Sequence, residues 1–183
     1  MKILQLKKMH LLVFMLSIAC SFTISAQIGG WKPELTKDAK EALKKMKDEY
    51  PSLSTYYQKS YAYVVFPKVT KAGLGIGGAA GKGIVFKGED VLGMSSLKQA
   101  SIGLQAGGQQ YSEVIFFENK EAFDHFTNGN LKFDAQASAV ALEKGASADV
   151  AYKDGVAVFT KAIGGLMIEA SLGGQHFSYK EKE

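Results

Sequence analysis

Apolar residues recur at helical spacing between Pro33 and Tyr50. Pro33 suits the first turn of a helix, because the N–H that proline lacks would have no intrahelical partner there. The apolar positions that follow share one helix face, and they are Leu35, Ala39, Ala42, Leu43, Met46 and Tyr50. The pattern therefore predicts an N-terminal amphipathic helix.

The other face of this helix carries five lysines and five carboxylates, several of them at i,i+4 spacing. They are Lys37, Lys40, Lys44, Lys45 and Lys47, and Glu34, Asp38, Glu41, Asp48 and Glu49. Such a balance is typical of a solvated face on a helix that docks against the rest of the protein. A membrane-surface helix would carry a basic excess and more bulky apolar residues. We therefore favour the docked helix.

Beyond Pro51, the segment SLSTYYQKS predicts a second, short helix, and YAYVVF predicts a strand that Pro67 ends. The pattern then changes to short alternating apolar runs broken by glycines. These runs are LGIGGAAGKGIVFKGEDVLGM, ASIGLQAGGQQYSEVIFFE and GVAVFTKAIGGLMIEASLGGQHFSY. They indicate an antiparallel meander.

Two segments interrupt the meander. Residues 119–129, NKEAFDHFTNG, predict a short helix, because Asn119 can cap its start and Gly129 can end it. The segment AQASAVAL, residues 135–142, is ambiguous, because alanine favours helix but the residues alternate with the period of a strand. We interpret it as a strand.

The segment KAGLGIGGAAGKGIVF contains a G-x-G-x-x-G at Gly73, Gly75 and Gly78. A dinucleotide-binding fingerprint needs a helix directly after these glycines, so that the helix N-terminus meets the pyrophosphate. Here Ile84 and Val85 and two further glycines follow, which argues against a helix. The P-loop pattern is also absent, since Lys82 is followed by Gly83 instead of Ser or Thr. We therefore expect no nucleotide.

The glycines have another interpretation. One face of a strand would carry only Gly73, Gly75 and Gly77, while Leu74 and Ile76 fill the other face. The alternating alanines from Ala135 to Ala141 repeat this pattern with methyl groups. Bare faces permit sharp curvature and close approach of other elements. We expect an α+β fold: a strongly curved, barrel-like antiparallel sheet of about eight strands, an N-terminal amphipathic helix and one or two short helices.

The first 26 residues have the features of an export signal: an early lysine cluster, the apolar centre MHLLVFMLSIACSF and a small-residue cleavage site before Gln27. We expect residues 27–183 to form a single domain in an exported, periplasmic or extracellular protein. Lipoprotein processing at Cys20 is the alternative, although Ser17 is unusual for that motif. Removing the signal leaves 19 basic against 18 acidic residues, which lowers the formal net charge from +4 to +1.

Composition excludes several kinds of chemistry. The chain has no arginine, so no bidentate guanidinium fork exists for phosphate or guanine, and we expect no nucleic-acid partner. Cys20 is the only cysteine, so a chain starting at Gln27 has no thiol for redox chemistry. His125 and His176 have no second histidine at metal spacing, and no nucleophile motif occurs. We expect no metal, no cofactor and no catalysis.

Four segments together resemble the SYLF domain, a lipid-binding module also described as a yeast actin-binding domain, and in particular its secreted bacterial branch. They are AYVVFPKVTKAGLGIGGAAGKG (62–83), SSLKQASIGLQAGGQQYSEVIFF (95–117), FTNGNLKFDAQASAVAL (126–142) and GVAVFTKAIGGLMIEASLGGQHFSYK (155–180). Glycine placement, Gln105 and the Gly107-Gly108-Gln109 turn agree with that family. The resemblance covers nearly all of residues 27–183, and it implies a lipid-interacting protein.

Phosphoinositide specificity and actin bundling transfer poorly to this chain. Arginine is absent, GMSSLKQ replaces a tryptophan-containing segment of eukaryotic members, and we expect no attached SH3 or phosphoinositide-binding domain. We expect peripheral binding to anionic phospholipid, in which Lys68, Lys71 and Lys82 meet headgroups and Trp31 inserts shallowly. A soluble carrier that encloses an apolar ligand in the curved sheet is the alternative.

Overall fold

A computed structural model describes residues 32–131, 140–141, 151–165 and 174–183, with backbone alone at 74–75, 101–106, 140–141 and 165. The elements follow in the order α2 (Pro33–Glu49), α3 (Leu53–Lys59), β1 (Ala62–Lys87), β2 (Asp90–Phe117), α4 (Lys120–Thr127), β3 (Val140–Ala141), β4 (Val156–Gly165) and β5 (Gln175–Glu181). The fold is α+β, as expected.

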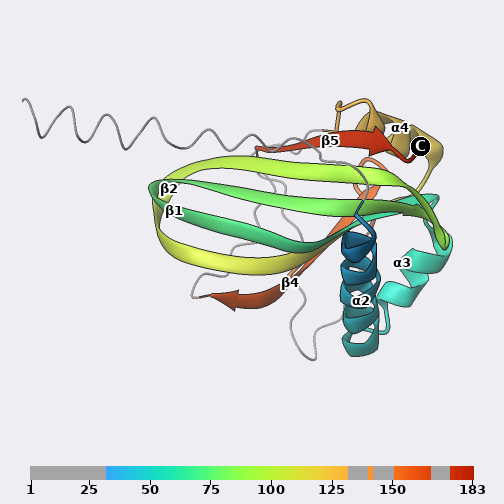
Figure 1. The fold of residues 1–183 in the computed structure, drawn as a ribbon, viewed down its shortest axis with the longest axis horizontal. Coiled ribbons are helices and arrows are strands. Elements are labelled where there is room, and N and C mark those ends of the chain that lie inside the picture. Colours follow the sequence, from blue (N-terminus) through green and yellow to red (C-terminus); the bar gives the residue numbers. More distant parts are fainter. Residues whose placement is uncertain (1–31, 132–139, 142–150, 166–173) are drawn as a thin grey trace, which may run out of the picture.

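A long antiparallel hairpin of β1 and β2 forms the centre of the fold (Figure 1). Its register runs from Lys87 opposite Asp90, at a tight turn with Gly88 at φ 57°, to Ala62 opposite Phe117. The register shifts between Leu74 and Ile76. This irregularity divides the hairpin into a first arm (62–73 with 107–117) and a second arm (76–87 with 90–102).

The two arms bind different neighbours. Strand β4 pairs antiparallel with β2 in the first arm, β5 pairs with β2 in the second, and β3 pairs parallel with β4. The arms themselves meet along β1, where a Cβ atom placed on Gly83 would lie 2.7 Å from the Val65 carbonyl oxygen and 2.7 Å from the Phe66 ring. Glycine at position 83 therefore leaves the room that this close approach requires.

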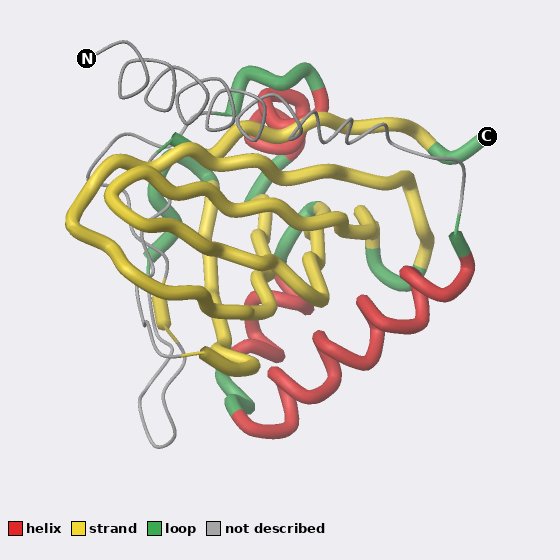
Figure 2. Tube along the Cα trace, turned by 60° about the vertical axis from the view of Figure 1, so that its left-hand side comes forward, coloured by secondary structure: helices red, strands yellow, loops and turns green. Residues whose placement is uncertain are grey.

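The helices cover opposite faces of the sheet, as Figures 1 and 2 show for α2 and α4. On one face, α2 and α3 bury Ala39, Leu43, Met46, Leu53 and Tyr56 against strand residues of both arms. On the other face, α4 buries Ala122 and Phe126 in a second cluster. Each cluster joins the arms: Tyr63 stacks on Phe86 at 5.2 Å in the first, and Phe66 contacts Phe177 at 5.9 Å in the second.

The three predicted helices are confirmed. Helix α2 begins at Pro33 as expected, and α3 lies within the predicted segment. Asn119 caps α4, since its side-chain oxygen accepts a hydrogen bond from the backbone N–H of Ala122 at 3.0 Å. Within the described residues none of the helices has the length and apolar character needed to cross a bilayer.

The strands differ from the prediction. Pro67 does not end its strand, because a register shift between Phe66 and Val69 accommodates the residue that lacks an N–H, and β1 continues to Lys87. The glycine runs lie inside long strands instead of separating short ones. The described sheet therefore has five strands and an open path, so neither about eight strands nor closure into a barrel is confirmed.

Three local predictions about the strands differ from the structure or concern residues that it does not fully describe. Ile76, expected on the strand face opposite the bare glycines, is 75% exposed beside the shift in register. Gly107, Gly108 and Gln109 form no turn but lie in β2, opposite residues 71–73 of β1. Of the alanine-rich segment 135–142, only Val140 and Ala141 are described; they form β3, and the rest falls outside the described residues.

Candidate functional site: a lysine-lined groove between α2 and the sheet

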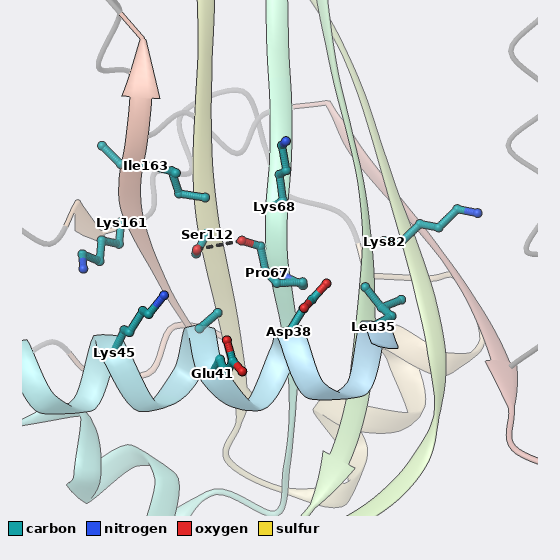
Figure 3. Close-up of a pocket in the computed structure, with 12 residues that line it drawn as sticks. Leu35, Asp38, Glu41, Lys45, Pro67, Lys68, Lys82, Ser112, Lys161 and Ile163 are labelled. Atoms are coloured by element: carbon teal, nitrogen blue, oxygen red, sulfur yellow. Dashed lines mark hydrogen bonds between the residues drawn. The ribbon is translucent and has the colours of Figure 1, made fainter. Parts of the chain in front are cut away.

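A groove of about 530 Å³ runs between α2 and the strands (Figure 3). Helix α2, both arms of β1, β2 and β4 contribute to it. Its lining residues are Leu35, Asp38, Glu41, Ala42 and Lys45 from α2, Pro67, Lys68 and Lys82 from β1, Ser112 from β2, and Lys161, Ala162 and Ile163 from β4. The groove thus combines four lysines, two carboxylates and an apolar floor.

The fold of β1 onto itself brings Lys68 and Lys82 to this groove. Lys68 follows Pro67 in the first arm, and Lys82 lies between two glycines in the second. A Cβ atom on Gly81 would lie 2.9 Å from the Cγ2 of Val69 and 3.1 Å from the carbonyl oxygen of Lys68, so the second arm can pass this close to the first only because residue 81 has no side chain. Two lysines 14 positions apart in the sequence therefore share one surface.

The helix wall of the groove follows from the packing of α2. Ala39, Leu43 and Met46 are buried against the sheet, which places neighbouring polar positions where the helix meets the strands. Figure 3 shows Asp38 and Lys45 rising from α2 toward the strands, with Lys68 and Lys82 extending from β1.

The strand wall is shaped by a bulge in β4. Gln110 lies opposite Gly164, whereas Tyr111 lies opposite Ala162, so Ile163 has no partner in the ladder. Its side chain is 54% exposed at the groove. The floor is fixed by Ser112, whose hydroxyl donates to the Pro67 carbonyl oxygen at 2.8 Å.

Ion pairs neutralise only part of the charge. Lys161 pairs with Glu49 at 2.6 Å, and Glu41 lies 3.9 Å from Lys37. The other charged lining residues, Lys45, Lys68, Lys82 and Asp38, make no ion pair within the described part of the chain. Among the described residues, the groove therefore presents three ammonium groups and one carboxylate without an ion-pair partner.

Contacts at the hairpin turn fix α2 and α3 relative to the sheet. The Tyr57 hydroxyl donates to the Glu89 carboxylate, and Lys40 lies 3.7 Å from the same carboxylate. The hydrogen bond from Tyr57 lowers the pKa of Glu89, with the nearby lysines adding to the effect. Glu89 is thus ionised at neutral pH and ties both helices to the hairpin.

The structure places the predicted lipid-binding residues in different environments. Lys68 and Lys82 lie together at the groove. Lys71 is 1% exposed, so the expectation that it presents an ammonium group at the surface is wrong. The register shift at Pro67 turns Val69 and Lys71 inward and leaves Lys68 outward. Trp31 lies outside the described residues.

The predicted structural glycines also differ among themselves. A Cβ atom on Gly73 would lie 2.5 Å from the Cα of Gly77, and Gly107 has φ 134°, so both sit where the hairpin bends. A Cβ atom on Gly78 would lie 3.0 Å from a carbonyl oxygen, but one on Gly108 would make only ordinary contacts. The surroundings of Gly75 fall outside the described residues.

The nucleotide interpretation of the glycine motif has no structural basis. Gly78 lies inside antiparallel strand β1 and opens no helix. No cluster of three potential metal-ligating His, Cys, Asp or Glu side chains occurs in the described part of the chain. His125 and His176 lie exposed on α4 and β5.

Sequence reasoning missed several lining residues, namely Asp38, Lys45, Lys161 and Ile163. The helical pattern placed the first two on the polar face of α2, but no sequence signal indicated which strands that helix faces. It also missed Glu113, which is fully buried and accepts one hydrogen bond from Gln175 Nε2 at 3.2 Å. Burial raises the pKa of Glu113 to about 7.

Comparison with known proteins gives two matches. Residues 98–183 match the family model Ysc84, described as a Las17-binding protein actin regulator. Beta cell expansion factor A of Aeromonas veronii is 28% identical over 155 residues, covering 79% of this chain. The aligned region spans 59% of that relative. The description of the family is that of a binding protein and regulator.

The matched region contains most of β2, helix α4 and strands β3 to β5, including the β4 wall of the groove. It also contains three of the four segments on which the resemblance to the SYLF domain was based, two of them entirely. The resemblance drawn from the sequence is therefore confirmed over residues 98–183, the part of the chain that matches the Ysc84 (SYLF) family model.

Proposed function

We propose that this protein is an exported, non-catalytic lipid-binding protein that associates peripherally with membranes through the groove. One observation carries the proposal: Lys45, Lys68 and Lys82 line one groove together with an exposed apolar side chain, Ile163, and none of the three lysines pairs with a described carboxylate. Ammonium groups attract anionic headgroups, and an apolar side chain at the same surface can enter the boundary with the acyl chains.

Local charge decides how strong this binding can be. If the expected signal is removed, the remaining chain is nearly neutral overall, so attraction to a membrane must come from local charge. Each lysine near an anionic surface contributes roughly 1 kcal/mol, and salt screens it over about 8–10 Å. Binding through three lysines is therefore expected to be moderate and sensitive to salt.

The soluble-carrier alternative is less favoured. A carrier needs enclosed apolar space, and the sheet face toward α4 is occupied by packed rings: Phe126 lies 5.6 Å from Phe177 and 4.9 Å from Phe117. Native mass spectrometry of protein from its own host separates the two functions. Stoichiometric retained lipid would favour the carrier.

Replacing Lys45, Lys68 and Lys82 together by glutamine is expected to weaken binding to anionic vesicles about a hundredfold, since three lysines contribute roughly 3 kcal/mol. Flotation with phosphatidylglycerol-containing vesicles at low and high salt measures it. The matched control replaces Lys44, Lys120 and Lys180, three exposed lysines that lie outside the groove and pair with carboxylates. Equal losses in both triple variants, or no vesicle binding by the parent protein, would contradict the proposal.

A further inference from the structure

The carboxylates of the groove need an explanation that attraction to anionic lipid does not supply. Asp38 and Glu41 lie on the same wall as Lys45. Glu41 has a distant partner in Lys37, at 3.9 Å, but Asp38 has no ion-pair partner among the described residues. A carboxylate in this position repels a purely anionic headgroup and weakens its binding.

The same carboxylate suits a headgroup that carries a positive charge beside its phosphate. Lys68 and Lys82 come from β1, whereas Asp38 comes from α2 across the groove. Groups of opposite sign on facing walls can bind the two ends of a zwitterion at once. Electrostatic complementarity of this kind gives specificity more than affinity.

The described lining residues favour one type of cation. A quaternary choline has no N–H donor, and proteins recognise it with cages of aromatic rings. The twelve described lining residues include no aromatic side chain. A primary ammonium has three N–H donors, which carboxylate oxygens accept directly.

We infer that the groove recognises a phosphoethanolamine group, with the phosphate at Lys68 and Lys82 and the primary ammonium at Asp38, assisted by Glu41. This inference rests on the groove being the lipid-binding surface of the proposed function. The groove would thus prefer an aminophospholipid headgroup to a choline headgroup or a purely anionic headgroup. Ile163 then lies at the rim, where the glycerol and acyl chains of such a lipid would continue.

Flotation at physiological salt with three vesicle compositions tests the inference. Phosphatidylcholine alone is the baseline, and part of it is replaced by phosphatidylethanolamine or by its N,N-dimethyl form. Phosphatidylethanolamine is expected to raise the bound fraction about threefold, as an exposed ion pair contributes at most about 1 kcal/mol. The dimethyl lipid, with fewer N–H donors, is expected to give a smaller gain.

Asp38→Asn is expected to abolish the gain from phosphatidylethanolamine and to strengthen binding to phosphatidylglycerol, because the carboxylate that repels an anionic headgroup is removed. Asp48→Asn is the matched control, because Asp48 lies on the same helix, outside the groove, paired with Lys44. This control is expected to keep the gain. An equal gain in the Asp38→Asn variant, or no gain in the parent protein, overturns the inference.

Two further comparisons are needed. One separates failure of this inference from failure of the proposed function, and the other separates a membrane lipid from the free headgroup compound as the ligand. Salt-sensitive binding to phosphatidylglycerol without any response to phosphatidylethanolamine overturns the inference and leaves the proposed function intact, whereas binding to neither overturns both. Soluble phosphoethanolamine is expected to compete with the vesicles, which supports recognition of the headgroup itself. If it binds in an Asp38-dependent manner without vesicle binding, the groove is a site for the free compound and the membrane source is overturned.

Discussion

Replacing Gly83 by alanine is expected to lower the free energy of unfolding by about 3 kcal/mol, at the upper end of what overpacking a core causes. The added methyl group would lie 2.7 Å from the Val65 carbonyl oxygen and 2.7 Å from the Phe66 ring. Phe66 is fully buried, and the carbonyl belongs to the backbone, so neither can move aside easily. Urea denaturation followed by circular dichroism measures the loss.

Gly164→Ala is the matched control for this substitution. Gly164 also lies in a strand, but a Cβ atom there would meet nothing within 4 Å and its φ is not positive. The control is expected to change stability by less than about 0.5 kcal/mol. If Gly83→Ala unfolds at the same urea concentration as the control, then close approach of the two arms of β1 is not what requires the glycine.

Replacing Glu113 by glutamine is expected to stabilise the protein by up to about 3 kcal/mol above pH 7, and hardly at all below pH 4.5. The folded protein keeps the Glu113 proton until about pH 7, whereas the unfolded chain loses it near the ordinary pKa of 4.5. The folded state therefore binds the extra proton, and the stability of the parent protein falls as the pH rises from about 4.5 to 7. Glutamine cannot ionise, so this fall should disappear.

Denaturant unfolding at pH 4.5, 6 and 8 checks the prediction, with Glu118→Gln as the control because Glu118 is exposed. The sign follows from geometry: Glu113 has no exposed surface, one carboxylate oxygen accepts a hydrogen bond from Gln175, and the other has no described partner. An ionised carboxylate in that position is poorly compensated. Stability that rises between pH 4.5 and 7 in the parent protein would rule out a buried, protonated Glu113.

Local patterns predicted the helices well because each depended on neighbouring residues. The apolar stripe and Pro33 defined α2, and Asn119 defined the start of α4. The strand boundaries were harder to predict. A glycine suggests the end of a strand when only its conformational freedom is considered. In this fold Gly81 and Gly83 lie within β1 and serve the approach of another part of the same strand. That use depends on contacts between distant residues, which alternation along the chain does not reveal.

The same limit applies to the groove. Simple alternation from Ala62, Val64 and Phe66 would turn Lys68 inward, but the shift at Pro67 reverses the order, so Lys68 faces out and Lys71 is buried. Both lysines looked alike in the sequence. Asp38 and Lys45 were visible only as members of a balanced polar helix face, and docking of α2 selected them for the groove.

The groove exists because the two arms of β1 lie against each other, so the fold and the proposed function are linked. Glycines allow the arms of β1 to meet, their meeting brings Lys82 beside Lys68, and α2 adds Lys45 and Asp38 across from them. A change that separates the arms should therefore reduce vesicle binding even though it alters no charge. The stability of the fold and the proposed vesicle binding thus depend on the same contact between the arms.

Site-specific fluorescence on vesicles distinguishes membrane binding through the groove from binding through another surface. Because Cys20 is the only cysteine, a Cys20→Ser background lets an environment-sensitive dye be attached at Ile163→Cys on the groove rim, or at Lys120→Cys on α4 as the control. We predict a blue shift with anionic vesicles at position 163, reversed by high salt, and none at position 120. A shift at position 120 but not at 163 in vesicle-bound protein would contradict binding through the groove.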